Sequence, residues 1–184
     1  MKSRAGILFP MARTDFPYAR MQDALARKAR ERSVEELNRI LADTITLRDL
    51  YKKYYWEASG STFYTLHLLF DSHHQDQSTL VDTIAERILA LGGFPAAMAA
   101  DVAKATTAPL VSANGEAPLI QLVRLIDAHK RALYGMRLSA RRAGEIGDDA
   151  TRDLLTMEVI QVNEDQARFV REEAQRSARS EALR

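Results

Sequence analysis

The segment between Gly60 and the Gly92–Gly93 pair contains no glycine or proline, and Pro95 follows the pair. This pattern predicts one long helix that begins near Thr62 and ends at the glycines. Its middle, SHHQDQST at residues 72–79, has no apolar residue, so a loop between two short helices is the alternative. A continuous helix is favoured because the side chains of metal-binding type on both sides of this stretch then share one face.

Those side chains form two pairs, His67 with Asp71 and Asp82 with Glu86. At about 100° per residue, all four lie within about 100° of one another around one helix. At about 1.5 Å per residue, however, Asp71 and Asp82 are about 16 Å apart along the axis, so one ion cannot bind both pairs. The four positions are symmetric about the point between residues 76 and 77. A second copy packed antiparallel across a two-fold axis would therefore complete each pair and create two equivalent sites.

One imidazole with three carboxylates is a ligand set that suits Fe(II), with Zn(II) and Mn(II) as competitors. The alternative is that these are ordinary surface residues at i,i+4 spacing. The Glu-x-x-His motifs of a metal site inside a single four-helix bundle do not occur in this sequence. We therefore expect any metal site to lie between subunits of a homo-oligomer, across the second helix.

The rest of the sequence predicts three further long helices. One has Ser33 as its N-cap, with Glu36 as capping-box partner, and runs to about Ala58. One follows Pro118 and fades at residues 143–147, and one is capped by Asp148 or Asp149. Residues 94–117 form a long crossover with an alanine-rich piece that suits a short helix. The fold class expected is all-α, a ferritin-like four-helix bundle with a long crossover carrying a short extra helix.

The bundle is expected to span residues 33–178, between an N-terminal arm at residues 1–32 and a frayed tail at residues 179–184. The arm holds eight Lys or Arg against three acids, so it could contact DNA phosphates, or it could be a solvated tail. The chain has no cysteine, which is compatible with a reducing cytoplasm. Its first residues lack the apolar core of a signal peptide, so we expect a cytoplasmic protein, in the bacterial nucleoid if the arm binds DNA.

The stretches YYWEASGSTFYTLHLLFD and LVDTIAERILALGGFP closely resemble the Dps family, the mini-ferritins that protect DNA in starved bacteria. The resemblance covers roughly residues 33–175. It implies a hollow shell of twelve subunits with a ferroxidase site at each two-fold interface. There Fe(II) is oxidised, preferably by hydrogen peroxide, and iron is stored inside as a ferric mineral. The positions that fit the family pattern are Trp56, Gly60, Phe63, Leu66, His67, Asp71, Asp82, Ala85, Glu86 and Arg87.

One position departs from the family pattern. The family usually has a histidine directly before the tryptophan, and here that position is Tyr55. A phenol, which stays protonated near neutral pH, is a poor ligand for Fe(II), although a phenolate could bind Fe(III). His74 lies on the same helical face and is a candidate substitute, with a solvated interface histidine as the alternative. Trp56 would lie beside the site, as a sacrificial electron donor or as a packing residue.

The segment GEIGDDATRD at residues 144–153 resembles the family segment that lines acidic three-fold pores. A narrow acidic mouth attracts cations electrostatically. Helix capping is the alternative role for Asp148. The pore candidates are Glu145, Asp148, Asp149 and Asp153.

Two functions follow from this resemblance and these residues. The first is an iron-oxidising and iron-storing enzyme, a ferroxidase, in which His67, Asp71, Asp82 and Glu86 are the catalytic metal ligands and Glu86 is a candidate bridge between two ions. The second is a DNA-binding nucleoid or shell protein with a weak or structural metal site and little ferroxidase activity. Tyr55 and the basic arm favour the second function.

Overall fold

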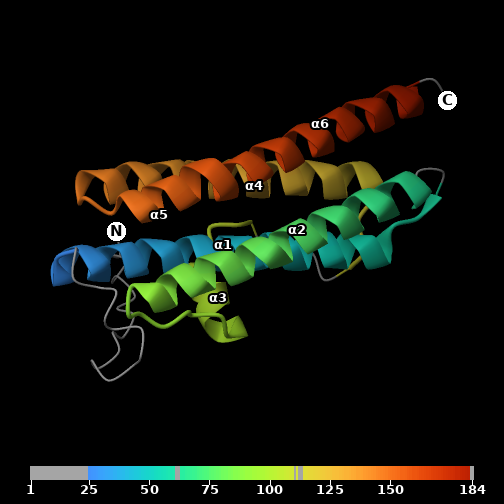
Figure 1. The fold of residues 1–184 in the computed structure, drawn as a ribbon. Helices are drawn as coiled ribbons and strands as arrows, with labels where there is room; N and C mark the ends of the chain where they lie inside the picture. The colour runs from blue at the N-terminus through green and yellow to red at the C-terminus, as the bar shows by residue number, and fades with distance from the viewer. Residues whose placement is uncertain (1–24, 61–62, 110, 112–113, 183–184) are drawn as a thin grey trace, which may run out of the picture.

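The computed structural model describes residues 25–60, 63–109, 111 and 114–182. Four long helical stretches run side by side as a bundle, and a short helix lies in the crossover between the second and third (Figure 1). The described residues contain no β-strand, so the prediction of an all-α, ferritin-like bundle with an extra helix is confirmed. The elements are α1 (Arg27–Glu57), α2 (Phe63–Ala90), α3 (Ala99–Ala105), α4 (Pro118–Glu145), α5 (Asp149–Leu154), the π-helical segment η3 (Leu155–Val159) and α6 (Ile160–Ala182).

The predicted start of the first helix at Ser33 is wrong. Helix α1 begins at Arg27, its N-cap residue Ala26 makes no side-chain cap, and Ser33 lies inside the helix with 2% of its surface exposed. Arg27 pairs with Glu31 one turn later, at 2.9 Å, which supports the added turns. Residues 27–32 of the expected arm are therefore helical, and residues 1–24 lie outside the described residues.

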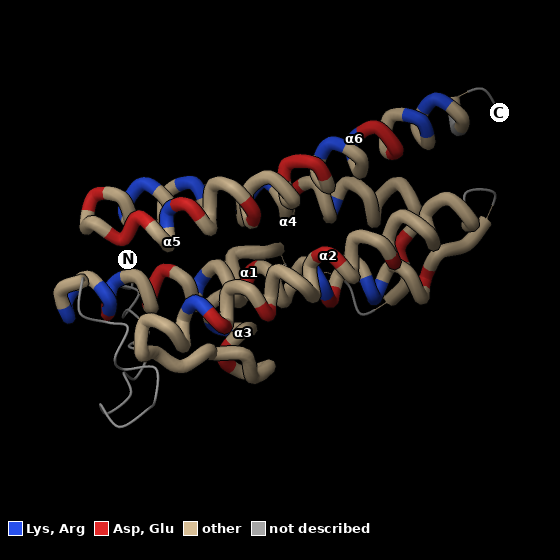
Figure 2. The backbone as a smooth tube through the Cα atoms, in the orientation of Figure 1, with Lys and Arg blue, Asp and Glu red and all other residues tan. Residues whose placement is uncertain are grey.

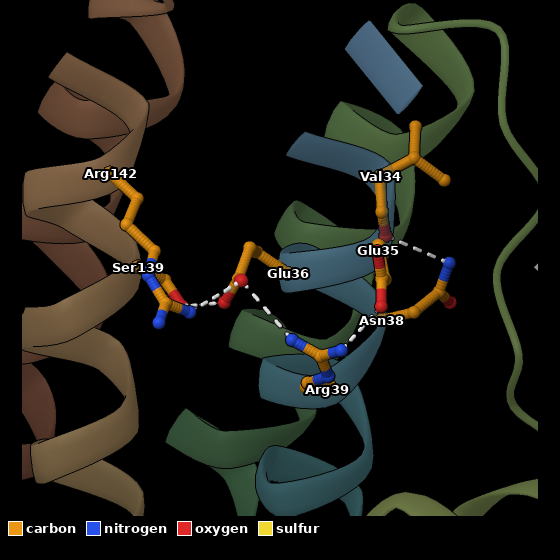
Figure 3. A network of polar contacts seen from close by, with 7 residues as sticks. All are labelled: Val34, Glu35, Glu36, Asn38, Arg39, Ser139 and Arg142. Atoms are coloured by element: carbon orange, nitrogen blue, oxygen red, sulfur yellow. Dashed lines mark hydrogen bonds and ion pairs between the residues drawn. The ribbon is translucent and has the colours of Figure 1, made fainter. Parts of the chain in front are cut away.

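Glu36, the expected capping-box partner, instead joins α1 to α4. Its carboxylate accepts hydrogen bonds from Ser139 and Arg142 of α4, both at 2.7 Å, and from Arg39 at 3.1 Å (Figure 3). The capping signal in the sequence was overridden because Glu36 has stronger, charged partners on the facing helix.

The polar stretch at residues 72–79 lies within α2, so the alternative of a loop is wrong. Its buried side chain Gln77 has polar partners on α6. The Nε2 atom of Gln77 donates to Asn163 Oδ1 at 3.0 Å and to Gln166 Oε1 at 2.8 Å, and all three side chains are buried. A helix can bury such residues when the facing helix satisfies their hydrogen bonds.

The crossover is fixed by buried polar groups of α1. Asn38 donates to the carbonyl of Phe94 at 3.2 Å and accepts from the backbone N–H of Ala96 at 2.7 Å. Asp43 accepts from the hydroxyls of Thr106 and Thr107, both at 2.9 Å, although burial still raises the pKa of Asp43. These bonds hold the chain across the bundle, and the predicted short helix is present as α3.

The fourth helical stretch starts as predicted, with Asp148 as the N-cap that accepts from the backbone N–H of Thr151 at 3.1 Å. Two features were not predicted. The stretch contains the π-helical segment η3, and α6 continues to Ala182, so residues 179–182 of the expected tail are helical. Residues 183–184 lie outside the described residues. None of the described helices is both long and apolar enough to cross a membrane.

Candidate metal centre

Helix α2 presents a continuous exposed stripe to the surface. We call it the α2 stripe, and its members are given at the end of this paragraph. Its two carboxylates, Asp82 and Glu86, lie in the C-terminal half, and neither makes a hydrogen bond or ion pair within the described part of the chain. The members of the stripe are Tyr64, Leu68, Ser72, Gln75, Thr79, Asp82, Glu86 and Leu89.

His67 lies at the edge of the stripe nearest α1, and its ring is held between aromatic neighbours. The ring of Tyr55 stacks on it with a centroid distance of 3.7 Å and an interplanar angle of 26°, and the ring of Phe63 lies at 4.9 Å. The Nδ1 atom of His67 is buried without a hydrogen-bond partner among the described residues. The imidazole is therefore positioned by packing, and one of its nitrogens lacks a partner.

Asp71 has a neighbour that the sequence did not suggest. The Nζ atom of Lys52, on α1, lies 3.4 Å from Asp71 Oδ1 and 4.2 Å from the centroid of the Tyr55 ring. The other carboxylate oxygen accepts from Gln75 Nε2 at 3.0 Å. Lys52 sits three residues before Tyr55, but no local signal in the sequence links it to α2. Its ammonium group compensates the charge of Asp71 before any metal binds.

The described residues of the single chain contain no group of three His, Cys, Asp or Glu side chains that could hold a metal ion. His67 and Asp71 lie at one end of α2, and Asp82 and Glu86 at the other. The four predicted ligands are therefore on one helix but do not meet in one chain. A complete site from these residues requires a second subunit.

The two supplementary candidates, His74 and Tyr55, already have contacts within the chain. His74 is half-buried, and its Nδ1 lies 3.1 Å from the backbone carbonyl of Arg48 on α1, as a donor would. Tyr55 packs its ring against His67 instead of facing solvent. Trp56, next to it, is 73% exposed, so it does not pack in the core of the single chain.

The four pore candidates have different surroundings. Asp148 is 3% exposed, and its Oδ1 lies 2.6 Å from Arg87 Nη2. Burial alone would raise the pKa of Asp148, but the Ser33 and Thr151 side chains and the positive charge of Arg87 together hold that pKa below its usual value. Asp148 therefore caps α5 and binds α2, which was its alternative role.

Asp149 and Asp153 are exposed, but both pair with the guanidinium of Arg152. Glu145 is exposed at the end of α4. Arg152 stands between the two aspartates in the sequence and was not among the predicted site residues. The negative field of this segment is therefore weaker than its acidic residues suggest.

Comparisons with known proteins agree with this fold. The family model described as a ferritin-like domain matches residues 34–180. The solved structure of DpsC from Streptomyces coelicolor is 43% identical, with a TM-score of 0.83 over 92% of this chain and 95% of that chain. Dps from Thermosynechococcus elongatus is 31% identical, with a TM-score of 0.75 over 79% of this chain and 91% of that chain. A relative from Halobacterium salinarum, named DNA protection during starvation protein, is 31% identical over 73% of this chain and 74% of its own length.

Proposed function

Because the chain belongs to the Dps family of ferritin-like proteins, we propose that it oxidises Fe(II) at sites formed where two copies of α2 pack antiparallel, and stores the ferric product in a hollow shell. Iron storage and DNA protection are the functions associated with this family. The observation that carries the proposal is the placement of four ligand-type residues along α2, which form no metal-binding group within the described chain but are symmetric about a point between residues 76 and 77. They are His67, Asp71, Asp82 and Glu86.

The exposed apolar residues of the stripe support the same symmetry. An antiparallel partner centred between residues 76 and 77 would place Tyr64 opposite Leu89, and Leu68 opposite Ala85. Tyr64 is 72% exposed and Leu68 is 52% exposed in the single chain. Large apolar side chains left exposed along one helix face mark an interaction surface. A two-fold interface buries them in both subunits, because the same face of each subunit takes part.

In the proposed site, His67 and Asp71 of one subunit bind Fe(II) together with Asp82 and Glu86 of a second copy. The stacked ring of Tyr55 fixes the orientation of the His67 imidazole. Asp71 must exchange its contact with Lys52 for a contact with iron. Two Fe(II) ions supply the two electrons that reduce hydrogen peroxide to water, so no hydroxyl radical is released. Zn(II) and Mn(II) suit the same ligands and would compete.

The assembly that follows is a shell of twelve subunits in the cytoplasm, with iron entering through acidic pores. The exposed carboxylates that could line such a pore are Glu145, Asp149 and Asp153, whereas Asp148 is buried and pairs with Arg87. Because Arg152 neutralises part of their charge, we expect the pore to attract cations only moderately.

An anaerobic Fe(II) titration of the purified oligomer, followed by hydrogen peroxide, tests the proposal. Ferric absorbance is recorded for the wild type and for a His67→Ala, Glu86→Ala double variant. A matched control carries Asp101→Ala and Glu158→Ala, which remove two exposed carboxylates outside α2, on α3 and η3. Rapid oxidation by the wild type and the control, lost in the double variant, is the expected result. Equally slow oxidation by all three proteins would refute the ferroxidase site.

A second candidate function, DNA binding, rests on the basic start of the described chain. The first two turns of α1 carry Arg27, Lys28, Arg30 and Arg32 with the single acid Glu31, and Figure 2 shows this concentration of Lys and Arg. Such a cluster attracts phosphate without sequence preference. A gel shift with the full chain and with a chain lacking residues 1–24 measures how much residues 1–24 add to the binding by this cluster. No shift by either protein at low salt would exclude this function.

A further inference from the structure

A layer of buried polar side chains crosses the bundle and joins all four long helical stretches. We call it the buried polar layer. Such groups cost folding stability unless each finds a partner, so a layer of six is an expensive feature in a small bundle. The proposed iron site uses none of them. The members are Tyr51 of α1, His73 and Gln77 of α2, His129 of α4, and Asn163 and Gln166 of α6.

Within this layer, Tyr51 and His129 form a short hydrogen bond. The Oη atom of Tyr51 lies 2.6 Å from Nε2 of His129, and both residues have no exposed surface. Burial lowers the pKa of His129 to about 3, so the imidazole is neutral near neutral pH and can accept a proton. The side chain of Asn163 acts in the opposite direction and raises that pKa. In the Nδ1–H tautomer of the neutral ring, Nε2 of His129 accepts the hydrogen of the Tyr51 hydroxyl.

The Tyr51 ring is also enclosed by other rings. His73 meets it edge-on with a centroid distance of 5.0 Å, and Phe70 lies at 6.1 Å. Water and solutes have no direct access to this ring. A tyrosine whose hydroxyl already donates to a base can lose an electron and its proton together, which avoids the unstable cation radical, and a dry, enclosed ring protects the neutral radical that results.

The pair is connected to the proposed iron site through α1. Tyr55 follows Tyr51 by one helical turn, a spacing that brings the two Cβ atoms to about 5–6 Å. The Tyr55 ring in turn stacks on His67 at 3.7 Å. Aromatic rings thus run from the buried hydrogen bond to the candidate iron ligand without a break longer than one turn of helix.

We propose that Tyr51 is a one-electron donor to the two-fold iron site, with His129 as the acceptor of its proton. This inference rests on the proposed ferroxidase function. It concerns the event in which a site that holds a single Fe(II) meets hydrogen peroxide. One Fe(II) supplies one electron, but cleavage of the O–O bond to two waters needs two.

Tyr51 supplies the second electron. One Fe(II), one hydrogen peroxide and two protons from solvent, together with the Tyr51 hydroxyl and neutral His129, give one Fe(III), two waters, a Tyr51 radical and protonated His129. The electron passes through Tyr55, and the hydroxyl proton moves to Nε2 of His129. A later Fe(II) returns an electron, and His129 returns the proton. The overall ratio of two Fe(II) per peroxide is kept, and no hydroxyl radical escapes.

The first test mixes the assembled protein with less than one Fe(II) per expected site and then with peroxide, and freezes the mixture rapidly for electron paramagnetic resonance. Wild type should give a tyrosyl signal that narrows when the protein contains ring-deuterated tyrosine. Tyr51→Phe should lose most of this signal and release more spin-trapped hydroxyl radical. Tyr54→Phe is the matched control, because Tyr54 is also buried on α1 but its hydroxyl lies 3.3 Å from Glu116 with no histidine.

An iron-free test separates this inference from the ferroxidase function. A photo-excited ruthenium polypyridyl complex with persulfate oxidises the protein from its surface, and the lifetime of the tyrosyl absorbance is recorded. A long-lived radical that is lost in Tyr51→Phe and shortened in His129→Phe supports the donor pair even if the wild type fails to oxidise iron. Normal iron oxidation with a radical that survives in Tyr51→Phe, or with no radical in either test, would overturn the inference and leave the ferroxidase function intact.

Discussion

The outward and inward faces of α2 carry similar kinds of side chain in different surroundings. Asp82 and Glu86 face outward and have no partner among the described residues of the chain. Gln77 faces inward, and its Nε2 atom donates to Asn163 and Gln166 of α6. The comparison teaches that polarity alone does not mark a binding site. Polar groups that are satisfied within the chain serve the bundle, and those left without partners are available to a second subunit or to an ion.

The largest expected effect concerns the outward face and comes from mixing two inactive variants. One double variant, His67→Ala with Asp71→Ala, lacks one half of each site. The other double variant, Asp82→Ala with Glu86→Ala, lacks the other half. Each variant alone should oxidise Fe(II) at least about 100-fold more slowly, since loss of even an indirect ligand contact costs about 10–100-fold.

Co-assembly of the two variants in equal amounts should restore about a quarter of the wild-type activity, because half of the dimers are mixed and each has one intact site. Initial rates of ferric absorbance after co-expression measure this recovery. Shells assembled from each variant alone are the control. No recovery in shells shown to contain both variants would mean that the four residues do not meet across a two-fold axis.

The second prediction concerns the inward face and pH. Burial lowers the pKa of His73 to about 4 and that of His129 to about 3. Below about pH 6.5 both histidines bind a proton in the unfolded chain but stay neutral in the folded chain. The free energy of unfolding is therefore full above that pH and falls as the pH is lowered toward 4. At pH 5 the expected loss is about 2 kcal/mol for each histidine.

Chemical denaturation at pH 7.5, 6 and 5 measures this loss. In His129→Phe the free energy of unfolding should fall about half as steeply with pH, because one of the two protons no longer binds on unfolding. His74→Phe is the matched control, since His74 is half-buried next to His73 in the sequence. A wild-type stability that stays level from pH 7.5 to pH 5 would contradict the neutral, buried state of both histidines.

The smallest expected effect is that of Lys52, at the border between the two faces. Lys52→Gln removes the ammonium group that lies 3.4 Å from Asp71 and repels an incoming cation. Both side chains are partly exposed, so the gain is limited to about 1 kcal/mol, or about fivefold tighter Fe(II) binding. Anaerobic titration calorimetry measures the affinity, with Lys53→Gln as the control on the adjacent position. Weaker binding by Lys52→Gln would show that the ammonium group supports the site.

The sequence predicted those features that depend on helical periodicity. The position of His67, Asp71, Asp82 and Glu86 along one side of α2 follows from the period of the helix. The bundle followed from four long helices with one long crossover, and the short crossover helix from an alanine-rich segment. Their role as iron ligands stays a prediction.

Features that depend on which helices face each other had no local signal. Lys52 approaches Asp71 from the preceding helix, and Tyr51 meets His129 of α4, 78 residues later. The capping signal at Ser33 was misleading for the same reason, since Glu36 found partners on α4.

The π-helical segment at Leu155–Val159 has a consequence for how the length of this chain can vary. A π turn holds one residue more than a regular helix without rotating the stretches before and after it. Loss of one residue there would convert the segment to regular helix and leave Asn163 and Gln166 facing the core. The same loss in the middle of α2 would turn Asp82 and Glu86 by about 100° relative to His67. A chain that lost one residue in the last helix would therefore keep its core, whereas the same loss in α2 would separate the halves of the proposed site.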